Sequence, residues 1–307
     1  MLCAAMAIAT PTDFASPPPK TASKTDIVET VDKLRATFES GVTRPAEWRV
    51  TQLRQLYRMI EDEESKILSA LKSDLGKCAA EGFIGETNMV MGEVKVLLSN
   101  VRRWMRPRTV SAPLTVQPAK AKIHPEPLGV ALIISPWNYP FQLAIAPLAG
   151  AISAGNCAAV KPSEVAPATS AVIAELCRKY LDQSAVAIIE GGVPETTALL
   201  EQRFDHIFYT GNGTVGRIVM QAAAKHLTPV VLELGGKSPC IIDRDVNLEV
   251  AARRIAWGKF FNAGQTCVAP DYLLVHEAVK KPFLDKLAEV IREFYGDDPQ
   301  KSPDYTR

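Results

Sequence analysis

The stretch HIFYTGNGTVGRIVMQAAAKHLTPVVLE, residues 206–233, has the pattern of a strand, a glycine-rich turn, a helix and a second strand. The spacing predicts strands over His206–Tyr209 and Val230–Leu234, and a helix over about Thr214–His226. The turn Gly211-Asn212-Gly213-Thr214-Val215-Gly216 fits G-x-G-x-x-G at the start of that helix. Glycines there let the backbone approach a phosphate near a helix N-terminus, although a plain tight turn fits this short motif equally well.

Short apolar runs alternate with helical stretches on both sides of this unit. Further strands are expected at Val130–Ile134, Ala158–Lys161, Val186–Ile189, Cys240–Ile242 and Tyr272–Val275. Further helices are expected at Phe141–Ala154, Pro167–Tyr180, Pro194–Glu201, Asn247–Phe261 and Ala278–Tyr295. This alternation predicts the α/β class, with a mostly parallel, doubly wound, Rossmann-like sheet that binds ligands at the carboxyl ends of its strands.

The residues before this region have a different hydrophobic periodicity. Apolar residues at helical spacing predict helices from Ile27 to Met105, and weak alternation between prolines predicts an extended segment over Val116–His124. We therefore expect a disordered tail at 1–25, a helical part at 26–110, an extended arm at 111–126, a dinucleotide-binding domain at 127–234 and a further α/β domain at 235–307. The tail is rich in Ser and Thr and poor in acids, so a plastid or mitochondrial targeting peptide stays open as an alternative.

Composition limits the class of protein. The 307 residues are 47% apolar and 22% charged, and 35 basic residues against 34 acidic ones leave a net charge of +1. This composition is that of a soluble globular chain without a general attraction for nucleic acid or anionic membrane. Leu128–Val160 is uncharged and long enough to cross a bilayer, but prolines interrupt it, so we expect a buried strand, a loop and a buried helix there.

The six cysteines are too sparse for a disulfide framework, and no pair of them forms C-x-x-C. We therefore expect a reducing compartment, the cytoplasm. The four histidines are scattered and no metal-ligand spacing occurs, so neither a metal site nor a Cys–His pair is expected.

Three further short motifs follow expected strands or helices. Lys161-Pro162-Ser163-Glu164 either places an ammonium and a carboxylate on ribose hydroxyls or forms a surface turn. Asn138, in Ser135-Pro136-Trp137-Asn138-Tyr139-Pro140, either donates its amide to an oxyanion or caps a loop. Cys267, in Gly264-Gln265-Thr266-Cys267-Val268, is either an exposed reactive thiol or an inert core cysteine.

Glu233 has a role from the pattern alone. An acidic residue about 20 positions after the glycine-rich turn binds a ribose hydroxyl in dinucleotide-binding folds. Glu233 lies 22 residues after Gly211 and ends an expected strand. This interpretation describes an ordinary Rossmann dehydrogenase, in which Cys267 has no chemical role.

Five motifs are specific when their order and spacing are taken together. They are Pro-Trp-Asn-Tyr-Pro at 136–140, Lys-Pro-Ser-Glu at 161–164, Tyr-Thr-Gly-Asn-Gly-Thr-Val-Gly at 209–216, Glu-Leu-Gly-Gly-Lys at 233–237 and Gly-Gln-Thr-Cys-Val-Ala-Pro-Asp-Tyr at 264–272. From about Ile27 to Arg307 the chain resembles the aldehyde dehydrogenase superfamily, and in particular its class 3, or fatty aldehyde dehydrogenase, branch.

This resemblance implies a cofactor domain, a catalytic domain and a small bridging β-arm. It makes Cys267 the nucleophile that forms a thiohemiacetal and then a thioester, with the Asn138 amide and the Cys267 backbone N–H on the oxyanion. Glu233 becomes the base that activates water for thioester hydrolysis, while Lys161 and Glu164 take the ribose. Gly211–Gly216 lies near the pyrophosphate and nicotinamide. The implied cofactor is NAD, with NADP left open, and the implied substrates are medium or long aliphatic and aromatic aldehydes.

The resemblance also bears on the extent of the chain. Relatives continue well beyond the position that matches Arg307, so we expect a C-terminally truncated sequence with an incomplete catalytic domain. A homodimer is expected for the full-length parent. For the chain itself, the alternatives are a non-catalytic nucleotide-binding fragment and an unstable product of truncation.

Overall fold

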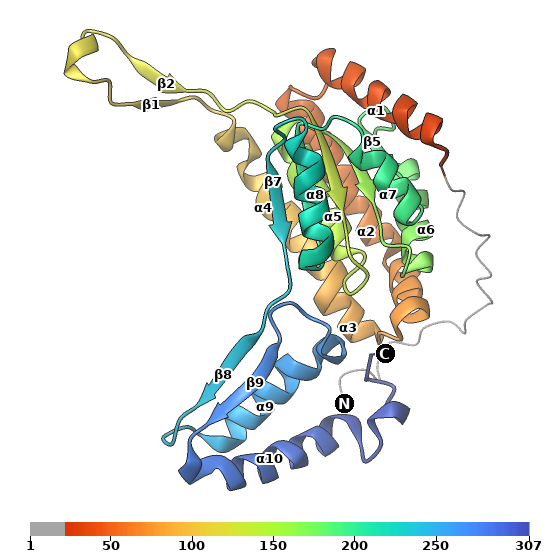
Figure 1. The fold of residues 1–307 in the computed structure, drawn as a ribbon, viewed down its shortest axis with the longest axis vertical. Coiled ribbons are helices and arrows are strands. Elements are labelled where there is room, and N and C mark those ends of the chain that lie inside the picture. The colour runs from red at the N-terminus through yellow and green to blue at the C-terminus, as the bar shows by residue number, and fades with distance from the viewer. Residues whose placement is uncertain (1–21, 307) are drawn as a thin grey trace.

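A five-stranded sheet forms the centre of the computed structural model, which describes residues 22–306 (Figure 1). Its order is β5-β4-β3-β6-β7 and every neighbouring pair is parallel. The strands are β3 (Val130–Ile134), β4 (Cys157–Lys161), β5 (Val186–Ile188), β6 (His206–Thr210) and β7 (Val230–Glu233). The apolar runs of β3 and β4 are buried throughout, as expected for a parallel sheet that is covered on both faces. The predicted doubly wound parallel sheet is confirmed.

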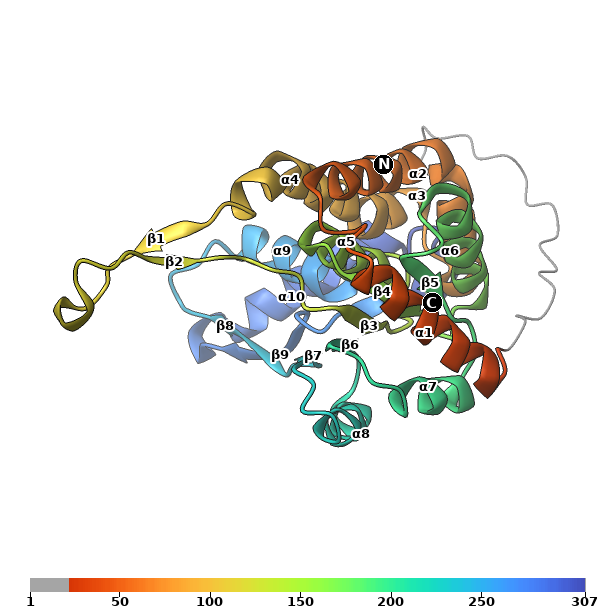
Figure 2. The same ribbon diagram turned by 90° about the horizontal axis from the view of Figure 1, so that it is seen from above.

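Helices cover both faces of this sheet (Figures 1 and 2). One face packs against α2 (Ala46–Leu75), α4 (Asn88–Trp104), α5 (Gln142–Ala154) and α6 (Pro167–Tyr180). The other packs against α1 (Lys24–Glu39), α7 (Val193–Leu200) and α8 (Gly213–Ala224). Alternate side chains of β3 point to opposite faces of the sheet. Ile133 belongs to the core beneath α2, α4, α5 and α6, and Leu132 belongs to the core beneath α1, α7 and α8. Leu128–Val160 therefore folds as strand, loop, helix and strand, and within residues 22–306 no helix is both long and apolar enough to cross a membrane.

Local capping explains where several helices begin. Ser23 and Asp26 form a reciprocal capping box at α1, and the side chain of Asn212 accepts the Val215 N–H at 3.0 Å to start α8. Helix α6 has no cap of its own. Asp74, at the end of α2, instead accepts the Ala168 and Thr169 N–H groups at 3.1 and 2.7 Å. From residue 130 onward, the predicted elements lie within one or two residues of the observed ones.

An antiparallel arm projects from this layered unit (Figures 1 and 2). Its strands are β1 (Arg108–Val110) and β2 (Ala121–Ile123), and the 3-10 turn η2 (Leu114–Val116) lies between them. The short α3 (Ala79–Gly82) and the π-helical turn η1 (Phe83–Thr87) precede α4. Of the tail expected over 1–25, residues 1–21 lie outside the described residues, and α1 begins at Lys24.

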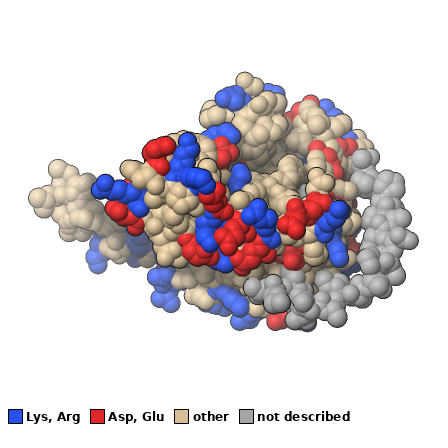
Figure 3. Space-filling model, turned by 90° about the horizontal axis from the view of Figure 1, so that it is seen from below, with Lys and Arg blue, Asp and Glu red and all other residues tan. Residues whose placement is uncertain are grey.

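The remainder of the chain forms a second, smaller unit beneath the sheet (Figure 1). Strands β8 (Ser238–Ile242) and β9 (Pro270–Val275) are parallel, and α9 (Leu248–Phe260) crosses between them. Helix α10 (Glu277–Tyr295) packs on α9 around Phe283 and Val290, and the 3-10 turns η3 (Phe261–Gly264) and η4 (Pro299–Lys301) complete the unit. Seen from below, basic and acidic side chains are interspersed over the surface, in keeping with the balanced net charge (Figure 3).

Candidate active site

The sheet reverses its winding between β3 and β6, and a cavity lies at that point. After β3 the chain adds β4 and β5 on one side, and it then returns to add β6 and β7 on the other. Ligands of open α/β sheets bind at such a switch point, outside the carboxyl ends of the strands. The cavity measures about 520 Å³, and the residues that line it include Asn138, Gly211, Asn212, Glu233 and Cys267. Five of the predicted site residues are therefore brought together.

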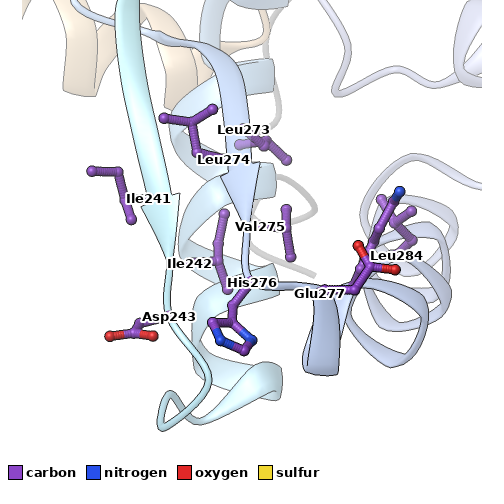
Figure 4. Close-up of a pocket in the computed structure, with 10 residues that line it drawn as sticks. Ile241, Ile242, Asp243, Leu273, Leu274, Val275, His276, Glu277 and Leu284 are labelled. Atoms are coloured by element: carbon purple, nitrogen blue, oxygen red, sulfur yellow. The ribbon is translucent and has the colours of Figure 1, made fainter.

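A larger pocket of about 720 Å³ lies elsewhere, at the ends of β8 and β9 (Figure 4). Ile241, Leu273 and Leu284 line it together with His276 and Glu277. None of the predicted site residues lines this pocket. Across residues 22–306, no group of three or more His, Cys, Asp or Glu side chains is arranged to hold a metal ion.

Asn138 lies on the loop between β3 and α5, at the carboxyl end of a buried strand. Its side-chain Nδ2 donates to the carbonyl oxygen of Gln265 at 2.7 Å, which ties this loop to the segment before Cys267. A primary amide carries two N–H donors, so one remains for a ligand oxygen. The side-chain Oδ1 is buried and has no hydrogen-bond partner within residues 22–306. The amide is therefore held at one N–H, in a residue that lines the cavity.

Cys267 follows a sharp backbone reversal at the end of α9. Asn262, Ala263 and Gly264 have φ values of 55°, 53° and 75°, all in the left-handed region. Two non-glycine residues in that region are uncommon and strained, and such strain is concentrated at functional sites. A hydrogen bond of 2.6 Å between the hydroxyls of Tyr139 and Thr266 holds the next part of the segment. The reversal brings the Cys267 segment up against the loop that carries Asn138.

Exposure distinguishes Cys267 from the buried cysteines. Cys267 is exposed, whereas Cys157 and Cys177 are buried. Burial raises the pKa of both buried thiols to about 12, because a thiolate would lose its solvation there. The thiolate is the reactive form of cysteine, so these two are inert core residues. Because Cys267 is exposed, the alternative that it is an inert core cysteine does not fit the structure.

Glu233 is the last residue of the edge strand β7 and is exposed. Its backbone oxygen accepts the Gly211 N–H at 2.9 Å, so β7 and the glycine-rich turn end together. The connection from β7 to β8 then passes close to the nucleophile candidate. A Cβ on Gly236 would lie only 2.8 Å from the carbonyl oxygen of Cys267. Glu233 and Cys267 both line the cavity.

Lys161 and Glu164 lie beside this cavity and do not line it. Lys161 ends β4, and its carbonyl accepts the Ser135 N–H at 3.1 Å. Its buried ammonium donates to the carbonyl of Pro162 at 2.6 Å and to the Glu164 carboxylate at 2.9 Å. Burial opposes ionisation of Glu164, but the hydrogen bond and charge of Lys161 outweigh it and lower the Glu164 pKa. The pair stands at the carboxyl edge of the next strand along the sheet.

Some residues of the glycine-rich turn line the cavity, and the others belong to α8. Gly211 and Asn212 line the cavity, while Gly213, Thr214, Val215 and Gly216 form the first turn of α8. A Cβ on Gly216 would lie 3.2 Å from Cδ2 of Leu234, so this glycine lets α8 pack closely on the sheet.

Two polar atoms that the sequence analysis did not single out also face this region. The hydroxyls of Ser135 and Thr210 are buried at the carboxyl ends of the neighbouring strands β3 and β6, and within residues 22–306 they have no hydrogen-bond partner. Both residues line the cavity. Buried polar groups are normally satisfied, so these two hydroxyls are candidates to bind a polar group at the carboxyl ends of the strands.

Comparison with known proteins gives one consistent family. Residues 12–306 match the model of the "Aldehyde dehydrogenase family". The chain is 52% identical over 275 residues to "Aldehyde dehydrogenase family 3 member A2" of Mus musculus, and the match covers 90% of this chain and 57% of that protein. It is 48% identical over 281 residues to "Aldehyde dehydrogenase, dimeric NADP-preferring" of Canis lupus familiaris, covering 92% of this chain and 62% of that protein.

A solved structure shows the same similarity in three dimensions. The substrate-bound state of Staphylococcus aureus AldH superposes with a TM-score of 0.89 at 45% sequence identity. The superposition covers 92% of this chain and 61% of that one. The chain therefore spans somewhat more than half the length of the relatives that it matches.

Proposed function

Because the chain belongs to the aldehyde dehydrogenase family, we propose that this protein oxidises an aldehyde to a carboxylic acid with NAD(P)⁺. The observation that supports the proposal is the convergence of an exposed thiol, an amide and a carboxylate on one cavity at the switch point of the sheet. A nucleophile, an oxyanion donor and a base are the three groups that acyl chemistry at a cysteine needs.

The family resemblance and the shared cavity support the following mechanism. The Cys267 thiolate adds to the aldehyde carbon, and the resulting oxyanion accepts hydrogen bonds from Asn138 Nδ2 and the Cys267 backbone N–H. When bound, the cofactor supplies the hydride acceptor. Loss of hydride from the thiohemiacetal leaves a thioester on the Cys267 sulfur. Glu233 removes a proton from the water that attacks this thioester, which releases the carboxylic acid and the thiol.

The residues beside the cavity fit a dinucleotide. The hydroxyls of Ser135 and Thr210, which have no partner within the described residues, offer hydrogen bonds to a polar ligand. Lys161 and Glu164 are the pair that we propose for the ribose hydroxyls; the buried Lys161 ammonium holds the half-exposed Glu164 carboxylate in place. The turn from Gly211 to Gly216 would approach the pyrophosphate and nicotinamide. A carboxylate at the ribose repels a 2′-phosphate, so we propose NAD as the preferred cofactor and NADP as the second.

The proposal extends to substrate, assembly and compartment. Medium or long aliphatic and aromatic aldehydes are the proposed substrates. A homodimer is the proposed assembly, and one relative is named "dimeric". The cytoplasm is the proposed compartment, because Cys267 must remain a free thiol to act as the nucleophile.

Turnover by the chain is the direct test. Formation of reduced nicotinamide would be followed with a panel of aldehydes and both cofactors, for the chain and for Cys267→Ala. We expect turnover that Cys267→Ala abolishes. Cofactor binding without turnover by the folded chain would contradict the proposal and support the non-catalytic nucleotide-binding fragment.

Glu233→Gln decides between the two roles of that residue. As the base, its loss should leave cofactor affinity unchanged and slow thioester hydrolysis, so that an acyl adduct on Cys267 accumulates and is seen by mass spectrometry. As a ribose ligand, its loss should weaken cofactor binding without any adduct, and that result would refute the assignment as base.

A further inference from the structure

The geometry points to a buried Lys77–Glu86 pair as positioning residues that set the Asn138 amide, an inference that rests on the proposed function. Lys77 and Glu86 contact the loop between β3 and α5, and neither residue lines the cavity. Their side chains are 1% and 0% exposed, and the two charged groups are 2.5 Å apart. The proposed mechanism has no step for either residue.

Lys77 contacts the loop at Asn138 itself. Its Nζ donates to the backbone oxygen of Asn138 at 3.0 Å, in addition to its ion pair with Glu86. The same ammonium lies 4.2 Å from the centroid of the Tyr139 ring, within the range of a cation–π contact. The buried Lys77 ammonium therefore holds both the backbone carbonyl of Asn138, the proposed oxyanion donor, and the ring of Tyr139.

Glu86 fixes the other end of the same loop. Its Oε2 accepts the backbone N–H groups of Phe141 and Gln142 at 3.1 and 2.8 Å, at the start of α5. A carboxylate at a helix N-terminus is favourable because the orphan N–H groups point at it. Glu86 lies within the π-helical turn η1, a conformation that is rare and occurs often at functional sites.

A second donor binds the same carbonyl oxygen. Asn262 Nδ2 donates to the Asn138 backbone oxygen at 2.8 Å. Asn262 is itself held through its backbone N–H by the carboxylate of Glu81. The Asn138 carbonyl therefore joins the Lys77–Glu86 pair to the strained segment that leads to Cys267.

Burying the charged groups of Lys77 and Glu86 costs desolvation free energy, and a role in positioning accounts for that cost. Burial lowers the pKa of Lys77 and raises that of Glu86, while their mutual attraction opposes both shifts. Buried ion pairs are often no better for stability than apolar residues of the same volume. By contrast, a misplacement of a catalytic group by about 1 Å can lower the reaction rate about a hundredfold. Apart from each other, the two side chains direct their hydrogen bonds to backbone groups within Asn138–Gln142.

The test is a double-mutant cycle between this pair and Asn138. The variant Lys77→Met with Glu86→Gln removes both charges, so no unpaired charge stays buried. In the wild-type background we expect kcat/KM to fall about ten- to a hundredfold, carried by kcat, while KM for the cofactor stays the same. In an Asn138→Ala background the same change should cost less than about threefold, because the group that the pair positions is already gone.

A second readout does not depend on turnover. Iodoacetamide alkylates free Cys267, and an aldehyde that forms the thiohemiacetal protects it. We expect the concentration of aldehyde needed for protection to rise about tenfold in the double variant, because a misplaced amide stabilises the oxyanion less well. If wild-type Cys267 gains no protection, the proposed function fails. If wild type is protected and the variant is protected equally, the positioning role alone fails.

The chain offers a matched control at the other end of β3. Arg35 pairs with Asp205 at 2.9 Å, and the Asp205 carboxylate accepts the Val130 N–H at 2.8 Å. Arg35→Met therefore breaks an ion pair that also holds β3, but away from the cavity, and should leave kcat unchanged. Lys77→Gln with Glu86→Gln, which keeps hydrogen-bonding groups at both positions and leaves no unpaired charge buried, is the second variant should the first double variant not fold. Equal losses with and without Asn138 would overturn the inference.

Discussion

Replacing Gly264 by alanine should weaken the folded state through the backbone alone. Gly264 has a φ of +75°, and a Cβ there would lie 3.0 Å from the carbonyl oxygen of Lys259. A left-handed conformation costs a residue with a Cβ about 1–2 kcal/mol. The tight contact with backbone adds roughly 1 kcal/mol. The smaller entropy of the unfolded alanine chain offsets about 0.4–1 kcal/mol. We expect a net loss of about 1–3 kcal/mol in the free energy of unfolding.

Urea unfolding followed by tryptophan fluorescence measures this loss, and Gly92→Ala is the matched control. Gly92 is an exposed residue inside α4, and a Cβ there would have no described atom from beyond its own helical turn within 4 Å. Alanine is favoured over glycine in a helix, so this variant should gain about 0.5–1 kcal/mol. Gly264→Ala should also raise the rate of Cys267 alkylation, because the loop would leave its conformation more often. A stability equal to wild type, or equal shifts in both variants, would refute the reasoning.

Two further predictions concern the scaffold. Asp74→Ala should lower the free energy of unfolding by about 1–3 kcal/mol, because the α6 N–H groups of Ala168 and Thr169 lose their acceptor; Asp74→Asn should recover part of this in the same urea titration. Burial lowers the pKa of His206 below its ordinary value of 6.5. The unfolded chain therefore binds more protons just below that pH, and stability falls as the pH drops from 7. The urea midpoint of His206→Gln should fall less between pH 7 and pH 5 than that of the wild type. An equal fall would contradict a lowered His206 pKa as a cause of the pH dependence.

The sequence by itself determined the elements of the sheet and their order of appearance. Val130–Ile134 is an unbroken apolar run, and Gly211–Gly216 is followed by a regular helical pattern, so local signals suffice. The capping residue Asn247 and the boundaries of α6 were also predictable, because caps and helix-breaking residues act within one turn. The family resemblance likewise needed only the order and spacing of five short motifs.

The tertiary structure decided which of those motifs lie together. Asn138, Glu233 and Cys267 are far apart in the chain, and they line one cavity because β3, β6 and β7 are successive neighbours in the sheet and α9 ends in a left-handed reversal. The pattern and the family resemblance give Glu233 different roles, ribose ligand and base, because a spacing of 22 residues carries no information about what lies opposite the strand end.

Lys77 and Glu86 show the limit of sequence reasoning most clearly. Nine positions apart in a charged helical region, they have the pattern of solvated surface residues. Their burial depends on the β3–α5 loop, more than fifty residues later, which supplies a carbonyl and two N–H groups for the charges to bind. Hydrophobic periodicity encodes which face of a helix is buried, but the partners of a buried charge are set only when distant segments pack together.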